Sequence, residues 1–180
     1  MRVIAGEKKG FPLKAPKGSN TRPTSDKIKG SIFNMISNNM NFNGKKAIDC
    51  FAGSGGLGIE FLSRGGEFCL FVEQNSQSYK TIHENIEKTS YGNKSKLVKG
   101  NVFSILDNER FDLFLIDPPY NKGIAQRTID MVTDEDLLNE GGLIVVETDS
   151  KESVKFSEDY FVLKAEKSYG DTKITILSRS

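Results

Sequence analysis

The sequence predicts a doubly wound α/β domain with a mostly parallel sheet. From residue 45 onward, apolar runs alternate with helical stretches, which is the pattern of strands joined by crossover helices. The runs are almost continuously apolar, as expected for parallel strands covered on both faces. A glycine-rich loop follows the first run. With 180 residues, 37% of them hydrophobic, the chain is the size of one globular domain. We expect a single domain over 1–180, with a short basic N-terminal extension and helix over 1–40 and a core over 41–180.

The N-terminal segment is rich in Gly, Pro and Lys, which predicts extended chain, turns and a small hairpin. Thr24, Ser25 and Asp26 then offer caps for a helix that reaches about residue 38. Apolar residues at helical spacing form one stripe of this helix: Ile28, Ile32, Phe33 and Ile36. Lys27 and Lys29 are expected to lie off that stripe.

Five strands are predicted, at residues 46–51, 67–73, 95–100, 111–117 and 141–148. Helical stretches at 56–64, 76–89, 102–108 and 123–139 lie between or after them. The last stretch, 160–180, contains two strand-like runs around the turn "YGDT" and no helix. We therefore expect the sheet to close with a C-terminal antiparallel hairpin.

Charge is distributed unevenly along the chain. The first 30 residues contain eight basic and two acidic residues, although the whole chain has a net charge of only +1. A basic segment on an acidic body suits contact with nucleic acid, because phosphate neutralisation supplies much of the affinity. A solubilising tail is the alternative interpretation of such a charge run.

Several classes of protein are disfavoured by composition. No apolar run approaches the roughly 20 residues of a membrane span, and the first residues lack the apolar region of a secretory signal. We therefore expect a cytoplasmic protein with no membrane contact. Cys50 and Cys69 lie in apolar runs and are expected to be buried, reduced thiols. With two cysteines and one histidine, His83, which we expect at the surface, no metal site is predicted.

The glycine-rich loop predicts a nucleotide-type ligand. Gly53, Gly55 and Gly58 have the spacing G-x-G-x-x-G between a strand and a helix, which lets a ligand approach backbone N–H groups. Glu73 ends the second strand, 20 residues after Gly53, where a carboxylate can bind a ribose diol. Together these features indicate an adenosine-type ligand across the strand ends.

Asp49 favours S-adenosylmethionine over NAD as that ligand. A carboxylate before the loop gives nothing to a pyrophosphate, whereas it attracts an ammonium or sulfonium group. Asn101 ends the third strand and can offer its amide to the adenine edge, with Val102 and Phe103 packing on the ring. A plain turn explains Asn101 equally well.

The stretch "DPPY", Asp117 to Tyr120, ends the fourth strand at the edge where the ligand is expected. Pro118 and Pro119 have fixed φ and make a stiff loop with oriented carbonyls. A carboxylate and a backbone carbonyl can both accept from the amino group of a base and hold it near a methyl donor. The Tyr120 ring can stack on that base. The motif therefore predicts methylation of an exocyclic amine.

These motifs resemble class I amino-methyltransferases. In addition, "RVIAGEKKGFPLKAP", "RPTSDKIKGSIFNMI" and "YGDTKITIL" resemble the RsmD family, which methylates N2 of a guanine in 16S ribosomal RNA. The resemblance covers essentially the whole chain. It implies a Rossmann-like fold, S-adenosylmethionine as cofactor, and a monomer acting on 16S rRNA within a small-subunit assembly particle.

The resemblance also implies roles for individual residues. The catalytic loop would comprise Asp117, Pro118, Pro119 and Tyr120. The cofactor would bind across residues at the strand ends: Asp49, Ala52, Gly53, Gly55, Gly58, Glu73, Asn101 and Val102. Many class I enzymes have Asp where Asn101 stands, so its role is the least fixed of these. RNA would contact a third set of residues: Lys8, Lys9, Lys14, Arg22 and Thr24.

Other functions share part of this pattern. A DNA or RNA adenine-N6 methyltransferase would use the same loop, although 180 residues leave little room for a DNA-recognition domain. Protein glutamine methyltransferases use a related loop, usually with Asn at the position of Asp117. An NAD-dependent oxidoreductase would give Pro118 and Tyr120 no role. A non-catalytic RNA-binding module would need only residues 1–30.

Overall fold

The computed structural model describes residues 1–16, 25–106, 109–120 and 122–180. The four α-helices in this part are α1 (Asp26–Ser37), α2 (Gly56–Ser63), α3 (Ser76–Thr89) and α4 (Ile124–Asp134), and the two short 3-10 helices are η1 (Gly92–Lys94) and η2 (Val102–Ser104). The strands are β1 (Lys46–Asp49), β2 (Phe68–Glu73), β3 (Ser95–Lys99), β4 (Phe111–Ile116), β5 (Leu138–Asp149), β6 (Phe161–Tyr169) and β7 (Thr172–Arg179).

All seven strands form one sheet in the order β3-β2-β1-β4-β5-β7-β6. The first five strands pair in parallel, and the direction of winding reverses between β1 and β4. The last two strands form the predicted hairpin, in which β7 pairs antiparallel with both β5 and β6. The doubly wound, mostly parallel fold predicted from the sequence is confirmed, including its antiparallel closure.

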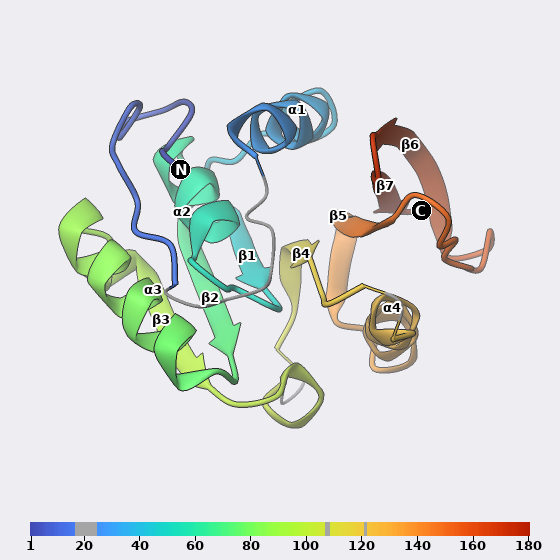
Figure 1. Cartoon of the computed structure of the whole chain (residues 1–180). Helices are drawn as coiled ribbons and strands as arrows, with labels where there is room; N and C mark the ends of the chain where they lie inside the picture. The colour runs from blue at the N-terminus through green and yellow to red at the C-terminus, as the bar shows by residue number, and fades with distance from the viewer. Residues whose placement is uncertain (17–24, 107–108, 121) are drawn as a thin grey trace.

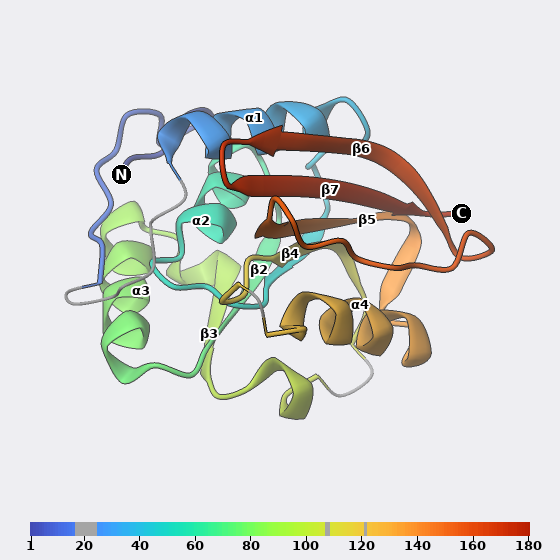
Figure 2. The same ribbon diagram turned by 45° about the vertical axis from the view of Figure 1, so that its right-hand side comes forward.

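Helices cover both faces of the sheet (Figures 1 and 2). The side chains of each strand alternate between two buried clusters, as a pleated strand between two helical layers requires. One cluster packs against α1, α2 and α3, and the other packs against α4 and Val102. The parallel strands are therefore buried on both sides, which explains their continuous apolar sequence.

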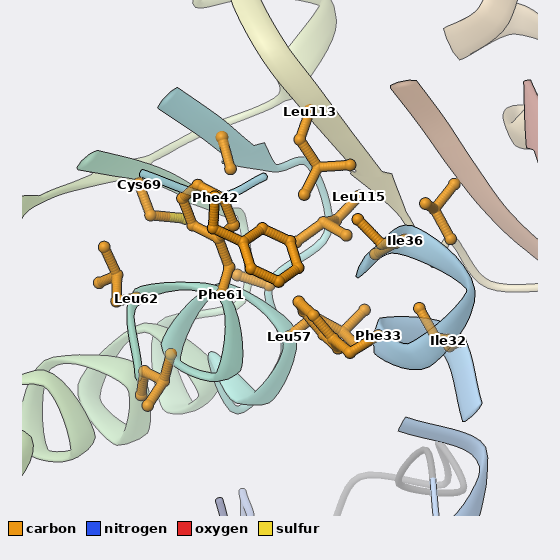
Figure 3. Close-up of a cluster of buried hydrophobic side chains, with 14 of the residues drawn as sticks. Ile32, Phe33, Ile36, Phe42, Leu57, Phe61, Leu62, Cys69, Leu113 and Leu115 are labelled. Carbon is orange, nitrogen blue, oxygen red and sulfur yellow. The ribbon is translucent and has the colours of Figure 1, made fainter. Parts of the chain in front are cut away.

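Aromatic packing joins α1 and α2 to the sheet (Figure 3). The ring of Phe42 lies 5.7 Å from that of Phe61 at 90°, and 6.1 Å from that of Phe33. Leu113 and Leu115 of β4 lie next to these rings in the same cluster. The N-terminal helix is thus part of the core packing rather than an appendage on its surface.

Residues 1–16 also pack closely on the core. A bridge between Arg2 and Pro12 closes the hairpin predicted for this segment. Val3 and Leu13 join the same buried cluster as α1 and α2. Gly6 has φ +83°, and a Cβ there would lie 1.8 Å from the Ser63 carbonyl oxygen. This part of the basic segment is therefore not a loose tail.

A buried carboxylate fixes the N-terminal hairpin. Glu60 of α2 is fully buried, and its two oxygens accept from the N–H groups of Ile4 (2.7 Å) and Ala5 (3.0 Å). The Arg64 side chain donates to the same carboxylate (2.8 Å). Lys29 of α1 places its ammonium 3.7 Å from Glu60 and donates to the Arg2 carbonyl at 2.6 Å.

The prediction that Lys29 lies off the buried stripe of its helix is therefore wrong: only 1% of Lys29 is exposed. Burial lowers the pKa of Lys29, and the nearby Glu60 carboxylate opposes that shift. The ammonium is retained inside because a carboxylate and a carbonyl oxygen replace its water. Lys27 is exposed, as expected.

Two predicted helices are shorter than expected. Of the stretch predicted as helix over 102–108, the structure describes residues 102–106, and η2 over Val102–Ser104 is the helix that these residues form. The helix predicted over 123–139 ends at Asp134 as α4, and Leu138 already begins β5. In the part of the chain that the structure describes, no helix is long and apolar enough to cross a membrane.

We expect Glu60→Gln to lower the free energy of unfolding by about 3 kcal/mol, because it leaves Lys29 buried without its counter-charge. Chemical denaturation at neutral pH measures this change. Glu84→Gln is the matched control, since Glu84 pairs with Lys14 at the surface and should leave stability unchanged. Adding Lys29→Met to Glu60→Gln should recover much of the loss. Equal stabilities for the two single variants would contradict this account of Glu60.

Candidate functional site

The carboxyl ends of the parallel strands open into a cavity of about 700 Å³. It lies at the reversal of winding between β1 and β4, where open α/β sheets bind their ligands. An acidic residue stands at or near the end of four strands that line it: Asp49, Glu73, Asp117 and Glu147. A volume of this size suits a nucleotide-sized ligand together with part of a second one.

The three predicted glycines have different structural roles. Gly53 has φ +54°, and Gly55, at φ +78°, is the N-cap of α2. A Cβ at Gly58 would lie 2.3 Å from the Phe71 ring, so this glycine permits α2 to pack on β2. Gly53 and Ala52 line the cavity, whereas Gly55 and Gly58 do not and instead allow the turn and the packing of α2.

Two carboxylates hold the glycine loop. The Gly58 N–H donates to Asp49 Oδ2 at 3.1 Å, and the Gly53 N–H donates to Glu73 Oε2 at 2.8 Å. The second oxygen of Glu73 accepts from the Asn75 N–H at 2.7 Å. Both predicted ligand-binding acids therefore also position backbone, and a ribose would bind a carboxylate whose orientation is already fixed.

The environment of Asp49 opposes its ionisation. Only 1% of the residue is exposed, and burial raises its pKa to about 7. The Gly58 N–H opposes this shift, while the charge of Glu73 adds to it. A cation in the adjoining cavity would favour the ionised form of Asp49.

The predicted adenine contacts follow β3. Asn101 is the N-cap of η2, and its side-chain oxygen accepts from the Phe103 N–H at 3.1 Å. Its amide nitrogen is the group that could donate to a ring nitrogen. Val102 is buried beside it, and both residues line the cavity.

The loop after β4 lies across the cavity from Glu73, and all of its predicted residues line the cavity: Asp117, Pro118, Pro119 and Tyr120. The Tyr120 hydroxyl donates to Glu147 Oε1 at 2.6 Å and lies 3.1 Å from Thr172 Oγ1. Burial and the hydrogen bond to Glu147 raise the pKa of Tyr120, so its hydroxyl stays protonated. These contacts to β5 and β7 anchor the hydroxyl end of the tyrosine ring.

The N-terminal segment forms another wall of the cavity. Met1, Ala15 and Lys29 line it. The fully buried Asn85 of α3 donates to the carbonyls of Ser54 (2.8 Å) and Lys14 (3.0 Å), and accepts from the Lys14 N–H (2.9 Å). One side chain therefore ties the glycine loop to the N-terminal segment.

Lys8, Lys9 and Lys14, the described residues of the predicted RNA-binding set, do not line the cavity. The Lys8 N–H bonds Ser63 at the far end of α2 from the glycine loop, and Lys8 lies over the Tyr91 ring. Lys9 is exposed next to it. Lys14 pairs with Glu84, which raises the pKa of Lys14 through their hydrogen bond. Arg22 and Thr24 lie outside the described residues.

Glu147, Thr172 and Asn85 were not identified from the sequence. Glu147 had a usable signal, since it ends the apolar run "LIVVE" just as Asp117 ends "LFLID". Thr172 contacts Tyr120, which is 52 residues away in the sequence, and Asn85 contacts Ser54, which is 31 residues away. Neither residue has a local sequence pattern that would reveal its contact.

The sulfur and histidine residues behave as predicted. Cys50 and Cys69 are free thiols, and burial raises their pKa values well above the ordinary range. His83 is exposed on α3. Over residues 1–16, 25–106, 109–120 and 122–180, no group of three His, Cys, Asp or Glu side chains could hold a metal ion.

Known proteins share this fold over the full chain. The structure of the yhhF protein of Escherichia coli superposes with a TM-score of 0.88 at 27% identity, covering 100% of this chain and 98% of the other. An RNA methyltransferase of Salinibacter ruber, solved with S-adenosyl-L-homocysteine, gives a TM-score of 0.67 at 12% identity, covering 88% and 94%. The chain thus has the class I S-adenosylmethionine-dependent methyltransferase fold.

The chain belongs to the family described as Conserved hypothetical protein 95, whose model matches residues 1–178. The YlbH protein of Bacillus subtilis (strain 168) is 36% identical, with 99% of each chain covered. Ribosomal RNA small subunit methyltransferase D of Escherichia coli (strain K12) is 28% identical, covering 99% of this chain and 90% of the other. The resemblance to the RsmD family is therefore confirmed.

Asp49 should make stability depend on pH in an unusual direction. The folded state keeps its proton up to about pH 7, whereas the unfolded chain releases it near 3.8. The folded state thus binds more protons in this interval, so this group's contribution to stability falls as pH rises through it. Asp49→Asn removes this titration. We therefore expect the free energy of unfolding of Asp49→Asn, minus that of the unsubstituted protein, to be larger at about pH 8 than at about pH 5. Urea denaturation at both pH values measures this, and an effect independent of pH would contradict it.

Proposed function

We propose that the protein transfers a methyl group from S-adenosylmethionine to the exocyclic N2 amino group of a guanine in 16S ribosomal RNA. The observation that carries the proposal is that one cavity is lined both by the nucleotide-binding residues and by the loop Asp117–Tyr120. The class I methyltransferase fold, shared with a protein solved with S-adenosyl-L-homocysteine, supports S-adenosylmethionine as the methyl donor. The names of the relatives supply the substrate class, ribosomal RNA of the small subunit.

The residues present fit that cofactor. Gly53 is held at a positive φ that favours glycine, which leaves the loop open beside the cavity. Glu73 offers a fixed carboxylate for a ribose, and Asp49 offers a charge for a cationic group. Asn101 and Val102 stand where an adenine would lie. S-adenosylmethionine supplies the activated methyl group.

The protein's own residues would prepare the acceptor. The Asp117 carboxylate and the Pro118 carbonyl accept the hydrogens of the guanine N2 group and hold its nitrogen toward the donor. Tyr120, anchored through its hydroxyl, stacks on the base. Asp117 is also placed to receive the proton that N2 loses, since the nitrogen becomes positively charged when it gains a methyl group.

The rest of the molecule would serve RNA docking. We propose that a single-domain monomer contacts a partly assembled small subunit in the cytoplasm. Lys8, Lys9 and Lys14, together with Arg22 and Thr24, would contact its RNA. Because Lys8 and Lys9 lie at the far end of α2, their contacts would be with RNA well away from the target base.

The direct test of the proposal uses labelled S-adenosylmethionine and small ribosomal subunits from cells that lack this protein. Digestion of the RNA and identification of the labelled nucleoside should give N2-methylguanosine. Labelled N6-methyladenosine would instead support the adenine alternative. Binding of NAD in place of S-adenosylmethionine, measured by titration calorimetry, would support the oxidoreductase alternative.

Asp117→Ala should reduce kcat by about 100- to 1,000-fold, because it removes an interaction formed with the reacting amine. Affinity for S-adenosylmethionine should stay nearly unchanged, as measured by calorimetry. Asp159→Ala, which removes an exposed carboxylate outside the cavity lining, is the control and should retain full activity. Unchanged turnover in Asp117→Ala would remove this residue from the mechanism.

Reversing charge at Lys8 and Lys9 should weaken RNA binding and reduce its salt dependence. If both contact phosphates, the slope of log K against log salt should fall by about 1 to 2. Lys164→Glu combined with Lys167→Glu makes the same change of charge on β6, at the other edge of the sheet. Filter binding of 16S rRNA fragments at several salt concentrations compares the two variants. Equal affinity for all proteins at low salt would show that Lys8 and Lys9 do not contact RNA.

A further inference from the structure

Asp117 and Glu147 lie at or just past the carboxyl ends of two neighbouring strands, and both line the cavity. Ile116 of β4 pairs with Val146 of β5, so the next residues, Asp117 and Glu147, follow in register on neighbouring parallel strands. Side chains at matched positions of such strands point to the same face, and the strands lie about 4.8 Å apart. Both residues line the cavity, and Glu147 is only 6% exposed.

The orientation of Glu147 is fixed by the catalytic loop itself. Its Oε1 accepts the Tyr120 hydroxyl at 2.6 Å, and Thr172 lies 3.1 Å from that hydroxyl. A carboxylate has about four acceptor sites, so Glu147 can accept more than one hydrogen bond. The structure therefore holds a second oriented acceptor close to the ring that would stack on the base.

Guanine and adenine differ next to their exocyclic amines. Guanine carries an N1–H beside its N2 amino group, whereas adenine has an N1 lone pair beside its N6 amino group. Asp117 and the Pro118 carbonyl account for the amino hydrogens of either base. The N1–H of a guanine would exchange its water for the protein on entering the cavity, which is costly unless an acceptor meets it there.

We propose that Glu147 accepts the N1–H of the target guanine and thereby selects guanine over adenine. The inference rests on the proposed guanine-N2 activity and names the residue that sets its specificity. An adenine in the same place would direct its N1 lone pair at the Glu147 carboxylate, an unfavourable contact. The paired acceptors at the ends of β4 and β5 match a base edge that carries only donors at these positions.

The alternative is that Glu147 only holds the Tyr120 hydroxyl and does not contact the base. In that case, Glu147→Gln and Tyr120→Phe should lower kcat/KM equally. Tyr120→Phe removes the hydroxyl and keeps the ring, so it breaks the anchor alone. If Glu147 contacts the base, Glu147→Gln should lower kcat/KM on unmodified small subunits about 10-fold or more beyond Tyr120→Phe. The double variant should keep that additional loss. Equal effects of the two single variants, with no further loss in the double variant, would overturn the proposal.

A base analogue gives the sharper test. Once the methylated guanine is mapped, small subunits are reconstituted with 2-aminopurine at that position, which keeps the 2-amino group but has no N1–H. The unsubstituted protein should lose about 10- to 100-fold in kcat/KM on this substrate. For Glu147→Gln, kcat/KM on the guanine substrate and on the 2-aminopurine substrate should differ by no more than about 3-fold, because the glutamine amide can donate to the N1 lone pair.

The outcomes separate this inference from the proposed function. Formation of N2-methylguanosine with the same discrimination in both proteins would overturn only the role of Glu147. Formation of N6-methyladenosine and no N2-methylguanosine would overturn both proposals. Affinity for S-adenosylmethionine, measured by calorimetry for each variant, should stay within about 3-fold of the unsubstituted protein, which confirms that the folded site is intact.

Discussion

The buried carboxylate of Glu60 is the interaction on which the architecture of the site depends. It takes two backbone N–H groups of the N-terminal hairpin and lies next to both Lys29 and Arg64. A charge in such a place is tolerated only when its partners replace the lost water. Because Glu60 belongs to the helix that follows the glycine loop, the same contact brings the first residues of the chain to the cavity wall. The basic segment and the ligand-binding loop are thereby parts of one packed unit.

Carboxylates at the strand ends serve the site in two ways. Asp49 and Glu73 accept from N–H groups of the glycine loop, so they shape the backbone around a ligand before any ligand arrives. Asp117 and Glu147 instead line the cavity at the ends of β4 and β5, where we propose that the base binds. For Asp49, desolvation prevails over the Gly58 N–H.

Much of the fold follows from local pattern. Continuous apolar runs identify β1, β2 and β4, and the loop from Gly53 to Gly58 marks the start of α2, because strand burial and tight turns leave signatures within a few residues. Lys29 shows where such reasoning fails. A lysine in a helix predicts a solvated side chain, and only the distant Glu60 makes its burial favourable. Glu147 gains its importance from register with Asp117, which depends on how two strands align and not on either segment alone.

Asn85 has a consequence for how this protein can diverge. Within the described residues, its side chain bonds only main-chain atoms of Lys14 and Ser54, so the side chains at both of those positions can change without loosening the connection. The outer surface near residue 14, which we propose contacts RNA, can thus vary between relatives while the glycine loop keeps its shape. The side chain at position 85, hidden in α3, is the one that lineages with altered substrates would have to retain.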